Sequence, residues 1–186
     1  MVPITALWIP ILLSAVIVFL ASSILHMVIP YHKSDYRKLP DEDRVLDALR
    51  ATGVTPGRVY HFPFCTHKEM KSPEAVEKFK RGPIGLLTVI PSGAPAMGKY
   101  LGLWFAYCVV VSIFVACVLG RMLSPGTQYP HVFHVAGIAA FLAYGVGHIQ
   151  DSIWKGQTWG VTAKHVLDGL IYALLTAGTF ALLWPK

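Results

Sequence analysis

Hydrophobic positions in this 186-residue chain gather into four long runs that contain almost no charged side chain. No Asp, Glu, Lys or Arg precedes Lys33, and the stretches 100–120, 122–150 and 169–185 are equally free of these residues. A helix needs about 20 apolar residues in a row to cross a bilayer. The pattern therefore predicts four membrane spans, running approximately over 6–28, 98–120, 130–150 and 161–184.

Lipid offers the backbone no hydrogen-bond partner, so these spans are predicted to be helices. The expected fold class is an all-α membrane protein with four transmembrane helices and a cytoplasmic segment of short helices between spans 1 and 2. The predicted division is 1–28 for the first helix, 29–97 for the cytoplasmic segment and 98–186 for the remaining three helices.

Local signals organise the connecting segment between the first two spans. Pro40 followed by three acidic residues predicts a helix that ends at Gly53, and Ser72-Pro73 predicts a second helix that ends at Gly82. Two short extended stretches, 59–64 and 85–90, are candidates for a pair of strands.

The composition agrees with a membrane protein, because 54% of the residues are apolar and only 14% are charged. Soluble domains average about 25% charged residues. Fourteen of the 16 lysines and arginines fall in 29–97, in 151–160 or directly beside them. Since basic residues stay on the cytoplasmic side, we expect a bacterial inner-membrane protein with both termini in the periplasm and residues 29–97 in the cytoplasm. This asymmetry also accounts for the net charge of +6, so no nucleic-acid partner is expected.

Small residues recur every four positions in three of the spans, a spacing that lets helices approach closely in lipid. These stripes fit contacts within the chain, self-association or contacts with other membrane subunits. The stripes are Ser112, Ala116 and Gly120; Ala139, Ala143 and Gly147; and Gly169, Ala173 and Ala177.

Three of the eight histidines, His26, His148 and His165, fall near the predicted cytoplasmic ends of the spans. Two of them open the same pattern, His148-x-x-Asp151 and His165-x-x-Asp168, and residues three apart share a helix face. Imidazole and carboxylate together suit a divalent transition metal, so these four residues are candidate metal ligands. The alternative is that they bond to one another or to lipid headgroups.

A b-type haem is a second possibility at the same depth. His148 and His165 are its candidate axial ligands, with His26 also within the same layer. His134 precedes His148 by 14 residues, a spacing that resembles two-haem cytochromes. No other span offers a histidine at the depth of His134, so a second haem is not expected.

Asp168 lies about two turns into the fourth span, where a carboxylate is unfavourable and marks function by default. It is therefore a candidate proton or ion relay. Lys164 and His165, four and three residues earlier, are close enough along the helix to neutralise it. In the connecting segment, His61-x3-Cys65-x-His67 has zinc-ligand residue types, but a fourth ligand is not evident.

Two stretches carry a resemblance to other proteins: residues 26–36 with 39–42, and residues 168–173, 176–180 and 184–185. The chain resembles a group of uncharacterised bacterial multi-pass membrane proteins over nearly its whole length. That resemblance implies an inner-membrane setting and no particular activity. No nucleotide-binding or hydrolase motif is present. We therefore expect a non-enzymatic accessory or assembly subunit of a membrane complex, with a metal or haem protein and an ion transporter as alternatives.

Overall fold

The computed structural model describes residues 1–186, which divide into two compact units. The first, called here the bundle, comprises Met1–Asp35 and Ala96–Lys186. The second, called the connecting segment, comprises Tyr36–Pro95. Residues 29–35, which were predicted to open the cytoplasmic segment, belong to the bundle.

The bundle contains the four long apolar helices that were predicted to span a membrane, which confirms the predicted helical fold class, although the segment between spans 1 and 2 also contains two strands. The candidate spans are Ile4–Val28, Met97–Met122, Tyr129–Trp154 and Trp159–Leu182, each within a few residues of its predicted position. Their long helices are α1 (Trp8–Ser23), α4 (Met97–Met122), α5 (Tyr129–Tyr144) and α7 (Trp159–Leu182). The short helix α6 (Ile149–Trp154) completes the third span.

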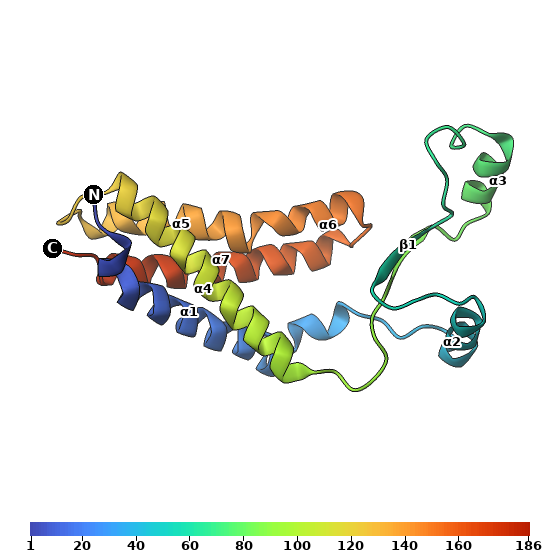
Figure 1. Ribbon diagram of the computed structural model, residues 1–186, viewed down its shortest axis with the longest axis horizontal. Helices are drawn as coiled ribbons and strands as arrows, with labels where there is room; N and C mark the ends of the chain where they lie inside the picture. Colours follow the sequence, from blue (N-terminus) through green and yellow to red (C-terminus); the bar gives the residue numbers. More distant parts are fainter. The chain divides into compact units, whose positions relative to one another are not determined.

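The four long helices pack in a ring in which α1 and α5 each contact both α4 and α7 (Figure 1). Successive spans run in opposite directions, as in an up-and-down four-helix bundle. One end is held by backbone bonds from Val2 to Gly120 (2.8 Å) and from Gly126 to Pro185 (2.9 Å). Both termini and the loop after α4 therefore lie at the same end, as an even number of spans requires.

Two of the small-residue stripes form the inner contacts of this ring. Gly120 and Gly169 are buried, and a β-carbon at Gly169 would lie only 2.6 Å from the nitrogen of Gly145. The stripe on α7 thus brings two spans together at Gly169, and the stripe on α4 brings the N-terminal residues against Gly120. The third stripe differs, because Ala143 and Gly147 are exposed and the inward face of α5 is instead formed by Val132, Ala136, Ala140 and Tyr144.

Two spans depart from α-helical geometry near the end opposite the termini. The first continues past α1 as a π-helical turn, Ile24–Val28, and then as a 3-10 helix, Pro30–Ser34. The third is interrupted by a 3-10 turn, Val146–His148, between α5 and α6. Gly145 and Gly147 weaken α-helix at that point. Non-α turns inside helices are often associated with functional sites, and here they carry His26 and His148.

The connecting segment consists of α2 (Glu42–Ala51), β1 (Arg58–Phe62), α3 (Pro73–Arg81) and β2 (Gly85–Val89). The two strands pair antiparallel, with Arg58 opposite Val89 and Phe62 opposite Gly85, which confirms the predicted pairing. Ser72 caps α3 by accepting a hydrogen bond from the Ala75 amide, also as predicted. Helix α2 starts at Glu42, two residues later than predicted, because Asp41 adopts a left-handed backbone conformation (φ 49°).

Candidate metal centre

A cluster of imidazole and carboxylate groups lies at the end of the bundle opposite the chain termini. His26 comes from the π-helical turn after α1, His32 from the 3-10 helix that follows, and His165 and Asp168 from α7. The 3-10 helix lies against α7, which joins residues more than 130 positions apart. The predicted pair His165 and Asp168 is thereby brought together with the predicted His26.

Asp168 is buried, with 2% of its surface exposed, and its carboxylate is partnered by the segment after α1. The hydroxyl of Tyr31 donates a hydrogen bond to its Oδ1. On Oδ2, the Nε2 of His32 lies at 2.8 Å and the Nε2 of His26 at 3.9 Å. The expectation that Lys164 and His165 neutralise this acid on its own helix is replaced by these three long-range partners.

Lys164 is instead committed to a second carboxylate, that of Asp35. Its ammonium lies 2.6 Å from Asp35 Oδ1 and also donates to the Tyr31 carbonyl (2.6 Å) and to Ser34 Oγ (2.8 Å). The other oxygen of Asp35 lies 2.6 Å from Nδ1 of His32. Burial by itself would raise the pKa of Asp35, but the bonds from Lys164 and His32 outweigh burial and hold this pKa below its usual value.

These contacts form a continuous chain of polar groups, from Asp168 through His32 and Asp35 to Lys164. His32 occupies its centre, with a carboxylate oxygen on each ring nitrogen. Such an arrangement fixes the ring orientation of His32 and leaves its Nε2 directed at Asp168.

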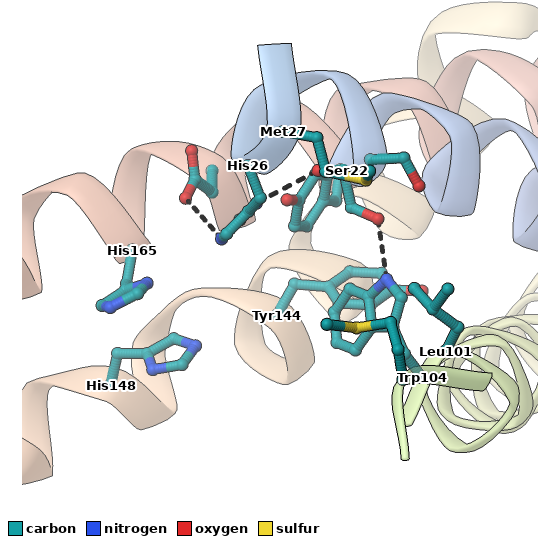
Figure 2. A pocket seen from close by; sticks show the side chains of 12 residues that line it. Ser22, His26, Met27, Leu101, Trp104, Tyr144, His148 and His165 are labelled. Atoms are coloured by element: carbon teal, nitrogen blue, oxygen red, sulfur yellow. Dashed lines mark hydrogen bonds and ion pairs between the residues drawn. The ribbon is translucent and has the colours of Figure 1, made fainter. Parts of the chain in front are cut away.

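Four imidazole rings stack across the same end of the bundle. Neighbouring ring centroids are 4.3 Å apart for His26 and His32, 5.4 Å for His32 and His165, and 5.0 Å for His165 and His148. Figure 2 shows the rings of His165 and His148 facing each other. The stack therefore links the three histidines singled out from the sequence through His32.

One group of side chains has the arrangement of metal ligands: His26, His32, His165 and Asp168. Each offers one ligand atom, and these four atoms all lie within 4.8 Å of one another. The Nδ1 of His26 lies 3.1 Å from the carbonyl oxygen of Ser22. A proton on that nitrogen leaves Nε2 free, which is how proteins commonly orient a metal-binding imidazole.

The other two predicted ligands lie outside this group. Asp151 is paired with Lys155 at 2.6 Å, and its other oxygen is 3.8 Å from Nδ1 of His148. His148 touches the cluster only through its stack on His165. In the connecting segment, His61, Cys65 and His67 form no group of ligand atoms, and Nδ1 of His61 faces the Pro63 carbonyl at 3.2 Å.

The sequence interpretation missed His32, Asp35 and Tyr31. A usable signal was present, because His32-x-x-Asp35 repeats the pattern of His148-x-x-Asp151 and His165-x-x-Asp168. This third copy lies beyond the first apolar run, where no predicted membrane span contains it. The return of residues 30–34 onto α7 depends on tertiary packing that the hydrophobic pattern does not encode.

A cavity of about 550 Å³ adjoins the cluster inside the bundle. His26, His148, His165 and Asp168 line one part of it, and Trp104 and Tyr144 line another. Figure 2 shows the last two on the far side from His148 and His165, with Trp104 bonded to Ser22. The cavity thus joins a polar, titratable wall to an apolar, aromatic one.

Comparison of the chain with protein-family models, with curated proteins and with solved structures finds no match. No family is therefore identified. What the observations support is a four-helix protein with candidate membrane spans, and its function has to be inferred from the cluster and the cavity.

Proposed function

We propose that this multi-pass membrane protein binds a divalent transition-metal ion through His26, His32, His165 and Asp168. The observation that carries the proposal is the convergence of four ligand atoms, from three separate elements, within 4.8 Å of one another. Three imidazoles and one carboxylate supply four ligand atoms, the number that a tetrahedral Zn²⁺ site requires, and both are ligand types that Zn²⁺ binds.

The required rearrangement is small. Zinc–nitrogen and zinc–oxygen bonds of about 2.0–2.2 Å place tetrahedral ligand atoms roughly 3.3 Å apart. The His32 and Asp168 ligand atoms are already 2.8 Å apart, while those of His26 and Asp168 are 3.9 Å apart. Because all four ligand atoms lie within 4.8 Å of one another, side-chain rotations that move them by at most about 1.5 Å would complete the site.

The surroundings supply the supporting contacts that metal sites usually have. Asp35 bonds to Nδ1 of His32, and the Ser22 carbonyl accepts from His26, so both rings are oriented from behind. Lys164 compensates the charge of Asp35, which leaves the charge of Asp168 for the ion. Binding displaces any proton shared between His32 and Asp168, because ligand atoms must be unprotonated.

Zinc titration of the purified, chelator-treated protein in lipid nanodiscs tests this proposal, with a colorimetric zinc chelator as competitor. We expect one ion per chain, and at least a tenfold loss of affinity in His26→Gln and in Asp168→Asn, since even outer-shell changes often weaken binding tenfold or more. The matched control is His131→Gln, an exposed histidine at the other end of the bundle. Absence of stoichiometric binding, or an equal loss in the control, would contradict the proposal.

A haem-binding function based on His148 and His165, with His26, is less well supported. Axial ligands approach a haem iron from opposite faces, whereas these two rings stack directly on each other at 5.0 Å. An absorption spectrum of the purified protein decides the point, because bound haem gives a Soret band and its absence excludes haem.

Proton relay at Asp168 is a second candidate function, favoured by the hydrogen-bonded chain through His32 to Asp35. Such chains of acids and histidines carry protons in membrane pumps and transporters. Proton flux in proteoliposomes should then be abolished by Asp168→Asn and retained by Asp151→Asn. Equal flux in the wild-type protein and in Asp168→Asn would exclude this role.

We further propose a bacterial inner-membrane location, with both termini in the periplasm and residues 29–97 in the cytoplasm, on the basis of the basic-residue asymmetry and the resemblance described above. The role of accessory or assembly subunit is supported by the outward-facing Ala143 and Gly147 on the third span. Small residues on a lipid-facing surface suit close contact with another helix. Purification in mild detergent should yield a co-purifying partner or an oligomer, and a lone monomer would argue against that role.

A further inference from the structure

Tyr172 presents an unusual group to the cavity. It is 4% exposed, it lines the cavity, and its hydroxyl is the one buried side-chain polar atom in the chain without a hydrogen-bond partner. A buried hydroxyl that makes no hydrogen bond is unfavourable, and most buried polar atoms have a partner. The Tyr172 hydroxyl therefore points to a molecule bound in the cavity that supplies a hydrogen-bond acceptor.

The neighbouring polar atoms of the aromatic wall are already engaged. Trp104 Nε1 donates to Ser22 Oγ at 2.7 Å, and the Tyr144 hydroxyl faces the Cys108 carbonyl at 3.5 Å. The ring of Tyr172 lies against both, with centroid distances of 6.1 Å to Trp104 and 5.7 Å to Tyr144. This part of the cavity offers three aromatic rings and one free donor, which suits a flat apolar molecule that carries an oxygen acceptor.

The position of Tyr172 along its helix restricts the source of that acceptor. It lies 13 residues after Trp159 and 10 before Leu182, the ends of α7. At a rise of 1.5 Å per residue these separations are about 20 Å and 15 Å. The ester oxygens of phospholipids stay at the membrane interface, roughly 15 Å from the bilayer centre. Phospholipid ester oxygens are thus too shallow to reach Tyr172, and this depth favours an acceptor carried by a molecule that dissolves in the hydrocarbon.

The cavity also has an entrance and a polar far wall. Met27, Met97 and Leu101 line it and are themselves exposed on the surface of the bundle. Flexible apolar side chains of this kind adapt to different shapes. Beyond the aromatic wall, His148, which is not a proposed metal ligand, offers a ring nitrogen to a second polar group of the same occupant.

We propose that this cavity binds the headgroup of a lipid-soluble quinone. One quinone carbonyl accepts the hydrogen bond of Tyr172, the ring packs against Trp104 and Tyr144, and the second carbonyl faces the imidazole wall. The volume of about 550 Å³ is within the usual range for small-molecule sites. Tyr172, Trp104, Tyr144 and His148 are not ligands of the proposed metal ion, so quinone binding through them does not depend on that ion.

The test uses chelator-treated full-length protein in nanodiscs, titrated with a decyl-tailed benzoquinone while tryptophan fluorescence is followed. Decylbenzene, which has the ring and tail but no carbonyl, is the comparison ligand, and its affinity is read from how well it displaces the quinone and restores the fluorescence. We expect saturable quenching by the quinone and at least fivefold weaker binding of decylbenzene. Tyr172→Phe removes only the hydroxyl and should weaken quinone binding about five- to tenfold without changing the affinity for decylbenzene.

Tyr107→Phe is the matched control, because the Tyr107 hydroxyl donates to the Ala143 carbonyl and Tyr107 does not line this cavity. Its quinone affinity should equal that of the wild-type protein. Thermal unfolding of both variants verifies that they remain folded. Equal binding of the two compounds, or unchanged quinone affinity in folded Tyr172→Phe, would overturn the proposal whatever the outcome of the zinc titration.

Discussion

The ammonium group of Lys164 lies 2.6 Å from a carboxylate oxygen of Asp35, a residue 129 positions earlier in the chain. This pair fastens the segment after α1 to α7, and the same segment brings Tyr31 and His32 onto Asp168. The geometry of the cluster therefore depends on an ion pair that contains none of the proposed metal ligands.

Replacing Lys164 by methionine should destabilise the protein. The Asp35 side chain is only 5% exposed and would lose its cationic partner. Because Lys164 itself is 25% exposed, we expect a loss of about 1–3 kcal/mol, less than for a fully buried pair. Thermal or denaturant unfolding in detergent measures it. Lys155→Met, which breaks the more exposed pair with Asp151, should change stability by less than about 1 kcal/mol, and equal effects would argue against the fastening role.

Replacing Gly169 by alanine should separate α7 from α5. The added β-carbon would lie 2.6 Å from the Gly145 nitrogen and 2.7 Å from the Tyr144 carbonyl carbon, both of them backbone atoms. We expect a destabilisation of about 1–3 kcal/mol from overpacking. Gly178→Ala on the same helix is the control, since its nearest neighbour would be the Tyr129 hydroxyl at 4.0 Å. Comparable stability of the two variants would show that the contact can relax.

The turn at Thr66 should weaken in acid. The Thr66 amide, and then its hydroxyl, donate to the Glu69 carboxylate and lower the pKa of Glu69 from its ordinary value of 4.5. A carboxyl with a lowered pKa in the folded state stabilises above its unfolded pKa, and this contribution is lost as pH falls through the folded pKa. Amide-exchange protection at Thr66 should therefore hold above the ordinary pKa of 4.5 and decline as pH falls below it, whereas Glu69→Gln should show no such decline.

The proposed orientation predicts where fused reporters work. Alkaline phosphatase joined after Lys186 should be active in bacterial cells, because it folds only in the periplasm, while green fluorescent protein at the same site should stay dark. The opposite pattern is expected for reporters inserted at Gly93, near the end of the connecting segment. A fluorescent C-terminal fusion would reverse the assignment of both sides without affecting the fold.

The hydrophobic pattern was sufficient for the spans, because an apolar run long enough to cross a membrane has few other stable conformations. The positions of Pro and Gly similarly predicted the elements of the connecting segment, where Ser72 caps α3 and the two strands pair. Asp41 shows the limit of such rules, since its left-handed backbone delays a helix that Pro40 was expected to begin.

The cluster was only partly predictable. His26 and His165 were predicted to lie at the same depth in the membrane, because the rise per residue of a helix converts sequence position into depth. The partners of Asp168 were not predictable in this way, because Tyr31 and His32 reach it from outside a span. Helix periodicity also does not predict where an α-helix widens into a π-helical turn. Because His26 lies in such a turn, its direction could not be predicted from the sequence.

The π-helical turn Ile24–Val28 also affects how the cluster and the cavity can be reached from outside the bundle. The His26 side chain, within the turn, is 45% exposed, whereas that of Asp168 behind it is 3% exposed. An ion that enters the proposed metal site past this turn would therefore meet His26 before the buried acid. A lipid-soluble molecule entering past Met27 arrives from the hydrocarbon. The same single turn of helix therefore borders both the group of candidate metal ligands, through His26, and the cavity, through His26 and Met27.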